Sequence, residues 1–184
     1  MQRTKSFCLI LAIILASTII GLSQKRTVVM DRLAEAIEQL VQEKHPEWTL
    51  KRIEPVYKGE EVIIDQWTAP REYVRVSVVP HRSAGEAKSE LQSLARNMKG
   101  EPGPVGIGEE VYSWGFGGSE TTFRKGRFTV YVSTTVNVDD DPEAAALSDD
   151  EKSKRKSANQ KKLSKEFAKH VDSALSLPSV RDLF

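Results

Sequence analysis

The chain has 184 residues, of which 39% are hydrophobic and 29% are charged, and its formal net charge is +1. This length is enough for one domain with a hydrophobic core and is short for two. A near-neutral chain lacks the basic excess of nucleic-acid-binding proteins, so no nucleic-acid partner is expected. The single cysteine, Cys8, excludes an internal disulfide framework and a cysteine-ligated metal site.

Residues 1–23 have the pattern of a secretory signal peptide. Two basic residues open the chain, and a mostly apolar run from Phe7 to Leu22 follows them. The alternative is an uncleaved anchor over residues 6–23, because the run approaches the length that spans a bilayer. Either way, residues 24–184 are expected outside the cytoplasmic membrane, periplasmic or secreted. Membrane contact is expected only through an uncleaved N-terminal segment.

Apolar residues at helical spacing predict three amphipathic helices. The first covers Val29 to Lys44 and ends at His45-Pro46, because the residue before a proline is pushed out of the helical region. The second covers Ala84 to Met98 and follows a capping box at Ser83. The third is a charged C-terminal helix over residues 148–176, also opened by a Ser-x-x-Glu box.

Alternating apolar and polar residues predict two runs of three strands, and each run follows a helix. The sequence after Trp67, V-R-V-S-V-V, faintly resembles the T-V-Y-V-S-T-T that follows Trp114. The predicted fold class is α+β, a single domain over residues 24–184 with an antiparallel sheet of about six strands. The predicted strands are 49–57, 61–67 and 72–79 in the first run, and 111–114, 121–123 and 128–136 in the second.

The segment G-I-G-E-E-V-Y-S-W, from Gly106, followed by T-F-R-K-G-R-F-T-V-Y-V-S, up to Ser133, resembles a pattern in small uncharacterised extracytoplasmic proteins of bacteria. In these proteins a Gly-x-Gly-acid-acid turn leads into a Tyr-bearing strand, and an F-R-x-G turn leads into an alternating valine strand. The resemblance covers about thirty residues. It implies export and an α+β sheet domain, and it brings no activity or site residue with it.

The charge pattern changes after Val136. Acidic residues dominate positions 139–151, and lysines and arginine dominate the start of the third predicted helix. We interpret the basic residues as a solubilising helix face; the alternative is contact with anionic envelope polymer or lipid headgroups through Lys152 to Lys162. Residues 152–160 have little to bury, so we expect them to project into solvent or to fray.

No motif in the sequence indicates a reaction. The histidines at positions 45, 81 and 170 show no HExxH or other paired-ligand spacing, and no G-x-S-x-G elbow is present. We therefore expect no catalytic residue, with an envelope hydrolase that uses His81 and a nearby acid or serine as the alternative.

No motif indicates a metal or a cofactor either. The glycines of 106–108 and 115–118 lie between predicted strands and are typical of turns rather than of a phosphate-binding loop. The acidic run 137–141 lacks the glycine and the distal glutamate of a calcium-binding EF-hand loop, so a solvated connector is preferred. No metal site and no cofactor are expected.

The aromatic residues of the second run of strands are the candidate binding surface. Trp114, Phe116, Tyr131 and Arg124 are predicted to lie around one sheet face and its turns, where aromatic side chains often contact ligands. The predicted function is an exported, non-catalytic binding or accessory domain whose partner is a protein or a small molecule. The third hypothesis is a membrane-tethered interaction protein.

Overall fold

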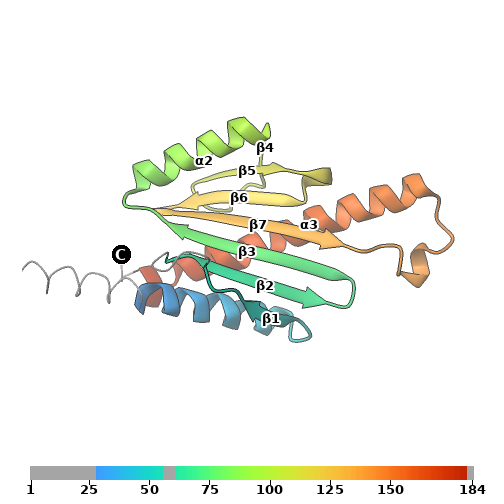
Figure 1. The fold of residues 1–184 in the computed structure, drawn as a ribbon, viewed down its shortest axis with the longest axis horizontal. Helices are drawn as coiled ribbons and strands as arrows, with labels where there is room; N and C mark the ends of the chain where they lie inside the picture. Colours follow the sequence, from blue (N-terminus) through green and yellow to red (C-terminus); the bar gives the residue numbers. More distant parts are fainter. Residues whose placement is uncertain (1–27, 56–60, 182–184) are drawn as a thin grey trace, which may run out of the picture.

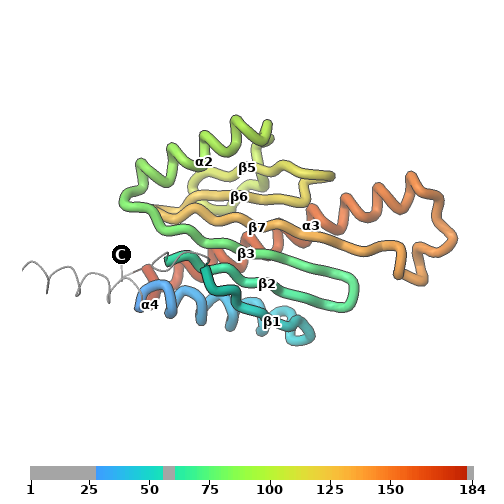
Figure 2. The backbone as a smooth tube through the Cα atoms, viewed as in Figure 1, coloured from blue at the N-terminus to red at the C-terminus, as the bar shows by residue number. Residues whose placement is uncertain are grey.

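The computed structural model describes residues 28–55 and 61–181, which form one antiparallel sheet with helices on both of its faces (Figure 1). The predicted α+β class is confirmed, with seven strands where about six were expected. The strands are β1 (Thr49–Arg52), β2 (Ile63–Ala69), β3 (Glu72–Pro80), β4 (Glu101–Pro102), β5 (Glu110–Trp114), β6 (Glu120–Lys125) and β7 (Phe128–Val136). Their order across the sheet is β1-β2-β3-β7-β6-β5-β4, so strands distant in sequence, β3 and β7, lie side by side at its centre (Figure 2).

The two faces of the sheet carry different helices. A helix over residues 28–44 and the long helix α3 (Asp149–Ser176) share the face with the hydrophobic core, and α2 (Ala84–Met98) packs over part of the opposite face. Side chains alternate between faces along β7. Thr134 accordingly hydrogen-bonds the backbone of Gln160 in α3, whereas Oγ1 of Thr129 lies 3.5 Å from the carbonyl oxygen of Ala87 in α2. In Figure 1, α3 runs behind the strands.

Side-chain caps set the starts of α2 and α3, as the sequence predicts. The hydroxyl of Ser83 accepts a hydrogen bond from the backbone amide of Glu86. Ser148 and Glu151 form a complete capping box at the start of α3. These bonds satisfy backbone amides that have no partner within the helix.

The hydrophobic core lies between the sheet and the two helices on its first face. The largest fully buried side chains there include Trp67, Phe123 and Phe167, from β2, β6 and α3. Phe167 contacts Trp67 and also Trp48, which follows the first helix. Helix α3 thus contacts strands from both halves of the sheet, β2 and β3 as well as β6 and β7.

Several boundaries differ from the sequence prediction. The strand predicted over 49–57 ends at Arg52, and part of the remainder falls in residues 56–60, outside the described part. The two-residue strand β4 was not predicted, because Pro102 is a poor strand former and pairing with β5 alone defines it. The predicted turn after Trp114 contains a single 3-10 turn, η1 (Phe116–Gly118). A second 3-10 turn, η2 (Pro142–Ala144), precedes α3, and a short helix, α4 (Pro178–Arg181), follows it.

Residues 152–160 were expected to project into solvent or to fray, and of these two alternatives fraying is wrong, because the start of α3 is helical. Gln160 is buried, and Ser157 lies against η1. The part of α3 before these contacts extends past the strands, as Figure 1 shows. The predicted N-terminal signal segment, residues 1–23, lies outside the described residues. Among the described residues, no helix combines the length and the apolar character needed to cross a membrane.

The hairpins β2–β3 and β6–β7 have the same pairing pattern. Trp67 pairs with Val74, and Phe123 pairs with Val130, so a shift of 56 positions (67 to 123, 74 to 130) maps one register onto the other. The same shift maps Val76 onto Val132, and these two residues face each other where the hairpins meet. The structural counterpart of Trp67 is therefore Phe123 rather than Trp114.

Candidate functional site

A groove of about 810 Å³ lies where α3 passes the edge of the sheet. The 3-10 turn η1, the edge strand β4 and the end of β5 form its other sides. Its volume falls within the usual range for small-molecule sites.

Lysines give the groove a basic lining. Lys161 and Lys165 lie one turn apart on α3, and Lys99 lies at the end of α2. All three are exposed, and no ion pair of theirs is found within residues 28–55 and 61–181. Lys125, by contrast, is 2.8 Å from a carboxylate oxygen of Asp172. Three lysines and one acidic residue, Glu101, are the charged groups among the described residues that line the groove. The electrostatic potential in the groove is therefore positive.

Short polar contacts fix α3 against the sheet beside the groove. The hydroxyls of Thr121 in β6 and Ser164 in α3 are 3.0 Å apart, and Ser164 also donates to the carbonyl oxygen of Gly118. Gly117 has a φ of +63°, and a Cβ at this position would lie 1.7 Å from Oγ of Ser157. Glycine therefore allows the turn to approach α3 closely, and the contacts hold the lysines of α3 at the groove.

Trp114 and Phe116, two of the predicted site residues, lie near this groove. Trp114 lines it but is only 8% exposed, and its indole Nε1 donates to Glu120 at 2.5 Å. Phe116 lies in η1 between two of the glycines that line the groove, and this residue is 60% exposed. Phe116 is thus an apolar residue at the rim, available to contact a bound molecule.

Tyr131 and Arg124, the other predicted site residues, lie elsewhere. Arg124 is at the far end of β6 from Glu120, which pairs with Trp114, and Nη1 of Arg124 is 2.6 Å from a carboxylate oxygen of Glu109. Tyr131 lies in the middle of β7, where burial, with a smaller contribution from Glu90, raises the pKa of its hydroxyl to about 12. The four predicted residues therefore do not gather around one concave surface.

His81, the residue of the hydrolase hypothesis, lies just after β3 and is half-buried. Its Nε2 is 2.9 Å from Oγ1 of Thr129. Thr129 is fully buried, so its hydroxyl is not accessible to an external substrate. This contact favours a structural role in which His81 satisfies a buried hydroxyl.

The acidic connector before α3 is held by arginines. Carboxylate oxygens of Asp141 lie 2.7 Å from Arg71 and 2.8 Å from Arg155, and Glu143 also pairs with Arg155. Burial raises the pKa of Asp141, but the amide of Glu143 and the two guanidinium groups outweigh burial and hold this pKa below its ordinary value. The arrangement matches the predicted connector better than a calcium loop, since its central carboxylate is neutralised by arginine.

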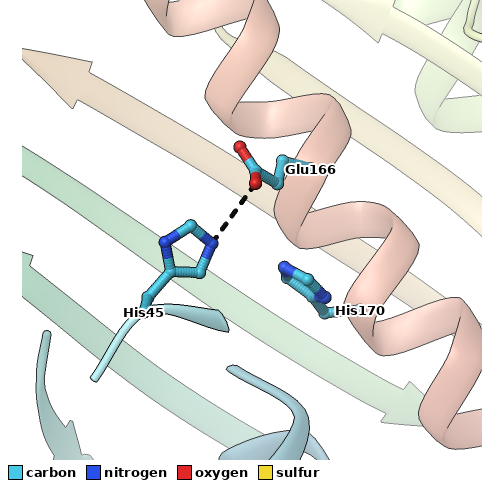
Figure 3. A group of neighbouring side chains, drawn as sticks. All are labelled: His45, Glu166 and His170. Carbon is cyan, nitrogen blue, oxygen red and sulfur yellow. Dashed lines mark ion pairs between the residues drawn. The ribbon is translucent and has the colours of Figure 1, made fainter. Parts of the chain in front are cut away.

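A second polar cluster lies on the other flank of α3 (Figure 3). His45 comes from the loop after the first helix, and Glu166 and His170 come from successive turns of α3. Nε2 of His45 is 3.4 Å from Oε1 of Glu166, and one ligand atom from each residue lies within 4.8 Å of the others. Burial, and to a lesser extent His45, lowers the pKa of His170. We call these three residues the histidine cluster.

Neither the histidine cluster nor the set of lysines in the groove was predicted from the sequence. The spacing of Glu166 and His170, four residues apart on a predicted helix, was a visible signal, because such residues share one helix face. His45 is distant in sequence, and only the packing of the first helix against α3 brings it to them. Lys99 likewise meets the lysines of α3 only through the sheet topology.

Comparison of the chain with protein-family models, with curated proteins and with solved structures finds no match.

Proposed function

We propose that this protein is an exported, non-catalytic binding domain whose groove binds a small multivalent anion carrying carboxylate or phosphate groups. The observation that carries the proposal is the set of three exposed lysines in the groove, none of which has an ion-pair partner within the described residues.

The composition of the groove supports this ligand class. Lysine ammonium groups recognise carboxylate and phosphate as point charges, and Lys99, Lys161 and Lys165 reach the groove from two separate elements. A ligand with two or more negative groups can contact several of them at once. Trp114 adds apolar surface to the groove, and the exposed Phe116 is the chain neighbour of two of the lining glycines.

The lysines of α3 fall into two groups. Most of the lysines on α3 are exposed and serve the helix as a solubilising face. Lys161 and Lys165 differ from the others because they line a hollow surface. The alternative, contact of Lys152 to Lys162 with anionic polymer or lipid headgroups, shares only one lysine, Lys161, with the groove.

A nuclear magnetic resonance titration of the purified protein with inorganic pyrophosphate, and separately with citrate, tests the proposal. We expect the amide resonances of residues 115–118 and of Lys161 to shift most, and the affinity to fall as salt is raised, because salt screens exposed charges. Shifts confined to Lys152 and its neighbours, or no shift at millimolar ligand, would contradict the proposal.

A matched pair of double variants separates groove binding from general charge attraction. Lys161→Ala/Lys165→Ala removes two groove lysines, and we expect each loss to weaken binding about fivefold, or about 1 kcal/mol. Lys162→Ala/Lys169→Ala removes the same charge from exposed positions of α3 outside the groove and should leave affinity nearly unchanged. Equal weakening in both variants would show that binding follows net charge alone.

Location outside the cytoplasmic membrane is part of the proposal. It rests on the apolar segment of residues 1–23 with its basic start. The mass of the protein recovered from its source distinguishes cleavage after Ser23 from retention of an anchor. A full-length chain in the cytoplasmic fraction would contradict export.

A further inference from the structure

The histidine cluster contains buried polar atoms that the surrounding protein does not satisfy. Nε2 of His45 and Nε2 of His170 are both buried, and neither forms a hydrogen bond with any described residue. Burying such a group without a partner is costly. The ion pair between His45 and Glu166, at 3.4 Å, involves only one of the two nitrogens and requires a protonated His45.

Aromatic packing accounts for the position of the His45 ring. It stacks on Phe167 with an interplanar angle of 16°, and its edge meets Trp48 and His170. Packing holds the ring in place but gives no partner to the nitrogen atoms. The His45 ring therefore has a fixed position, and Nε2 of His45 and Nε2 of His170 remain without a hydrogen bond from the described residues.

We propose that His45, Glu166 and His170 bind a divalent transition metal ion, with Zn²⁺ as the best fit. Two imidazole nitrogens and one carboxylate form a ligand set that suits zinc, whereas calcium and magnesium prefer oxygen ligands alone. The metal binds the neutral imidazole and the ionised carboxylate, so metal binding competes with protons for these side chains.

The distances in the cluster agree with this assignment. A tetrahedral zinc site with bonds of about 2.0–2.1 Å places its ligand atoms about 3.3 Å apart. The distance of 3.4 Å between His45 and Glu166 already meets this requirement, and the other separations are within 4.8 Å. Glu166 is 39% exposed at its side chain, so it can close on an ion by rotation without disturbing the core.

The bound ion would join two distant parts of the chain. His45 follows the helix over residues 28–44, and its backbone amide still bonds Val41 of that helix. Glu166 and His170 belong to α3. Zinc would therefore link the end of the first helix to α3, in addition to the contact between Trp48 and Phe167.

The test is titration of the chelator-treated, tag-free protein with zinc chloride, followed by calorimetry and by thermal unfolding. We expect one equivalent of zinc to bind with a micromolar or tighter dissociation constant, and the unfolding midpoint to rise. Excess magnesium or calcium should not displace it. Substitution of Co²⁺ for Zn²⁺ should give the visible absorption of a tetrahedral site.

Variants identify the ligands. His170→Gln and Glu166→Gln should each weaken zinc binding at least tenfold, while His81→Gln, which alters the third histidine, should not. Asp140→Asn, in the acidic connector, is a second control that should bind zinc as the parent does. Because Glu166→Gln alters a partly exposed side chain, it keeps the test valid if a histidine variant fails to fold.

Three outcomes would overturn the proposal. The first is a dissociation constant weaker than about 100 μM for the folded parent protein. The second is a loss of affinity in His81→Gln or Asp140→Asn as large as that in Glu166→Gln. The third is an unfolding midpoint that zinc leaves unchanged or lowers at saturating concentration.

Discussion

The hairpins β2–β3 and β6–β7 share one pairing pattern but bury different chemistry at equivalent positions. Asp65 in β2 corresponds to Thr121 in β6 by the shift of 56 positions, and both side chains are buried. Asp65 pairs with Arg52 of the neighbouring strand β1, whereas Thr121 meets Ser164 of α3. In the first hairpin the buried polar side chain thus finds its partner within the sheet. In the second hairpin it finds its partner in α3, the helix packed on the sheet.

A second pair of positions shows the same difference. Val78 in β3 is purely apolar, and its counterpart Thr134 in β7 donates to the carbonyl oxygens of Ser119 and Gln160. Hydrophobic packing gives little direction to a helix that lies on a sheet, but hydrogen bonds specify its position. The polar residues of the second hairpin therefore help to position α3 beside the groove.

Removal of Arg52 should have the largest effect on the first hairpin. Asp65 has no exposed side-chain surface, and Arg52 holds both of its carboxylate oxygens, at 2.7 and 3.1 Å. Arg52→Ala leaves a buried charge without a partner, so we expect a loss of about 3–5 kcal/mol in the free energy of unfolding. Urea denaturation measures it.

The double variant Arg52→Ala/Asp65→Asn is the control for this prediction. It removes the buried charge together with its partner and should regain part of the lost stability. A loss of less than about 1 kcal/mol in Arg52→Ala would show that the ion pair contributes no more than an exposed one.

Substitution of Gly117 tests the close approach of η1 to α3. Gly117→Ala adds a Cβ that would meet Ser157 at 1.7 Å, and it also forces alanine into a positive φ of 63°. We expect a loss of about 2 kcal/mol, of which about half comes from the backbone conformation. Thermal unfolding measures the loss.

Gly126→Ala is the matched variant, since Gly126 has a φ of +54° and no atom within 4 Å of the added Cβ. It should lose about 1 kcal/mol, from the backbone conformation alone. Equal losses at Gly117 and Gly126 would mean that η1 moves away from α3 without cost.

The bond between Thr121 and Ser164 should give the smallest of these effects. Thr121→Val removes one hydroxyl, but Ser164 keeps the carbonyl oxygens of Gly118 and Lys161 as acceptors. The expected loss is therefore about 1 kcal/mol, the net value of one hydrogen bond. A double-mutant cycle with Ser164→Ala measures the coupling energy between the two side chains. A coupling energy near zero would show that Thr121 does not help to position α3.

Local features of the fold were predictable from the sequence. The spacing of apolar residues and the Ser83 cap predicted α2 with its observed bounds, and alternating valines predicted β7 from Phe128 to Val136. These signals act over a few residues, so they do not depend on the rest of the structure. The short strand β4 lacks such a signal, because its pairing with β5 is its only defining feature.

The candidate sites depend on contacts between distant residues. The sequence shows Lys161 and Lys165 as members of a charged helix, and nothing local distinguishes them from Lys162 and Lys169. Only the position of α3 on the sheet turns two of these lysines toward the groove. Trp114, one of the predicted binding residues, lines this groove, and its burial and its bond to Glu120 make it a wall of the groove.

The two border strands of the sheet have features that oppose the addition of a strand from another chain. An unpaired strand edge is a template on which another chain can add a strand and begin a fibre. Here one border strand, β1, has four residues and carries the exposed charge of Lys51, and the other, β4, has two residues and ends in Pro102. Proline offers no amide hydrogen, and charge repels a like neighbour. Both borders of the sheet therefore oppose its growth into a larger aggregate.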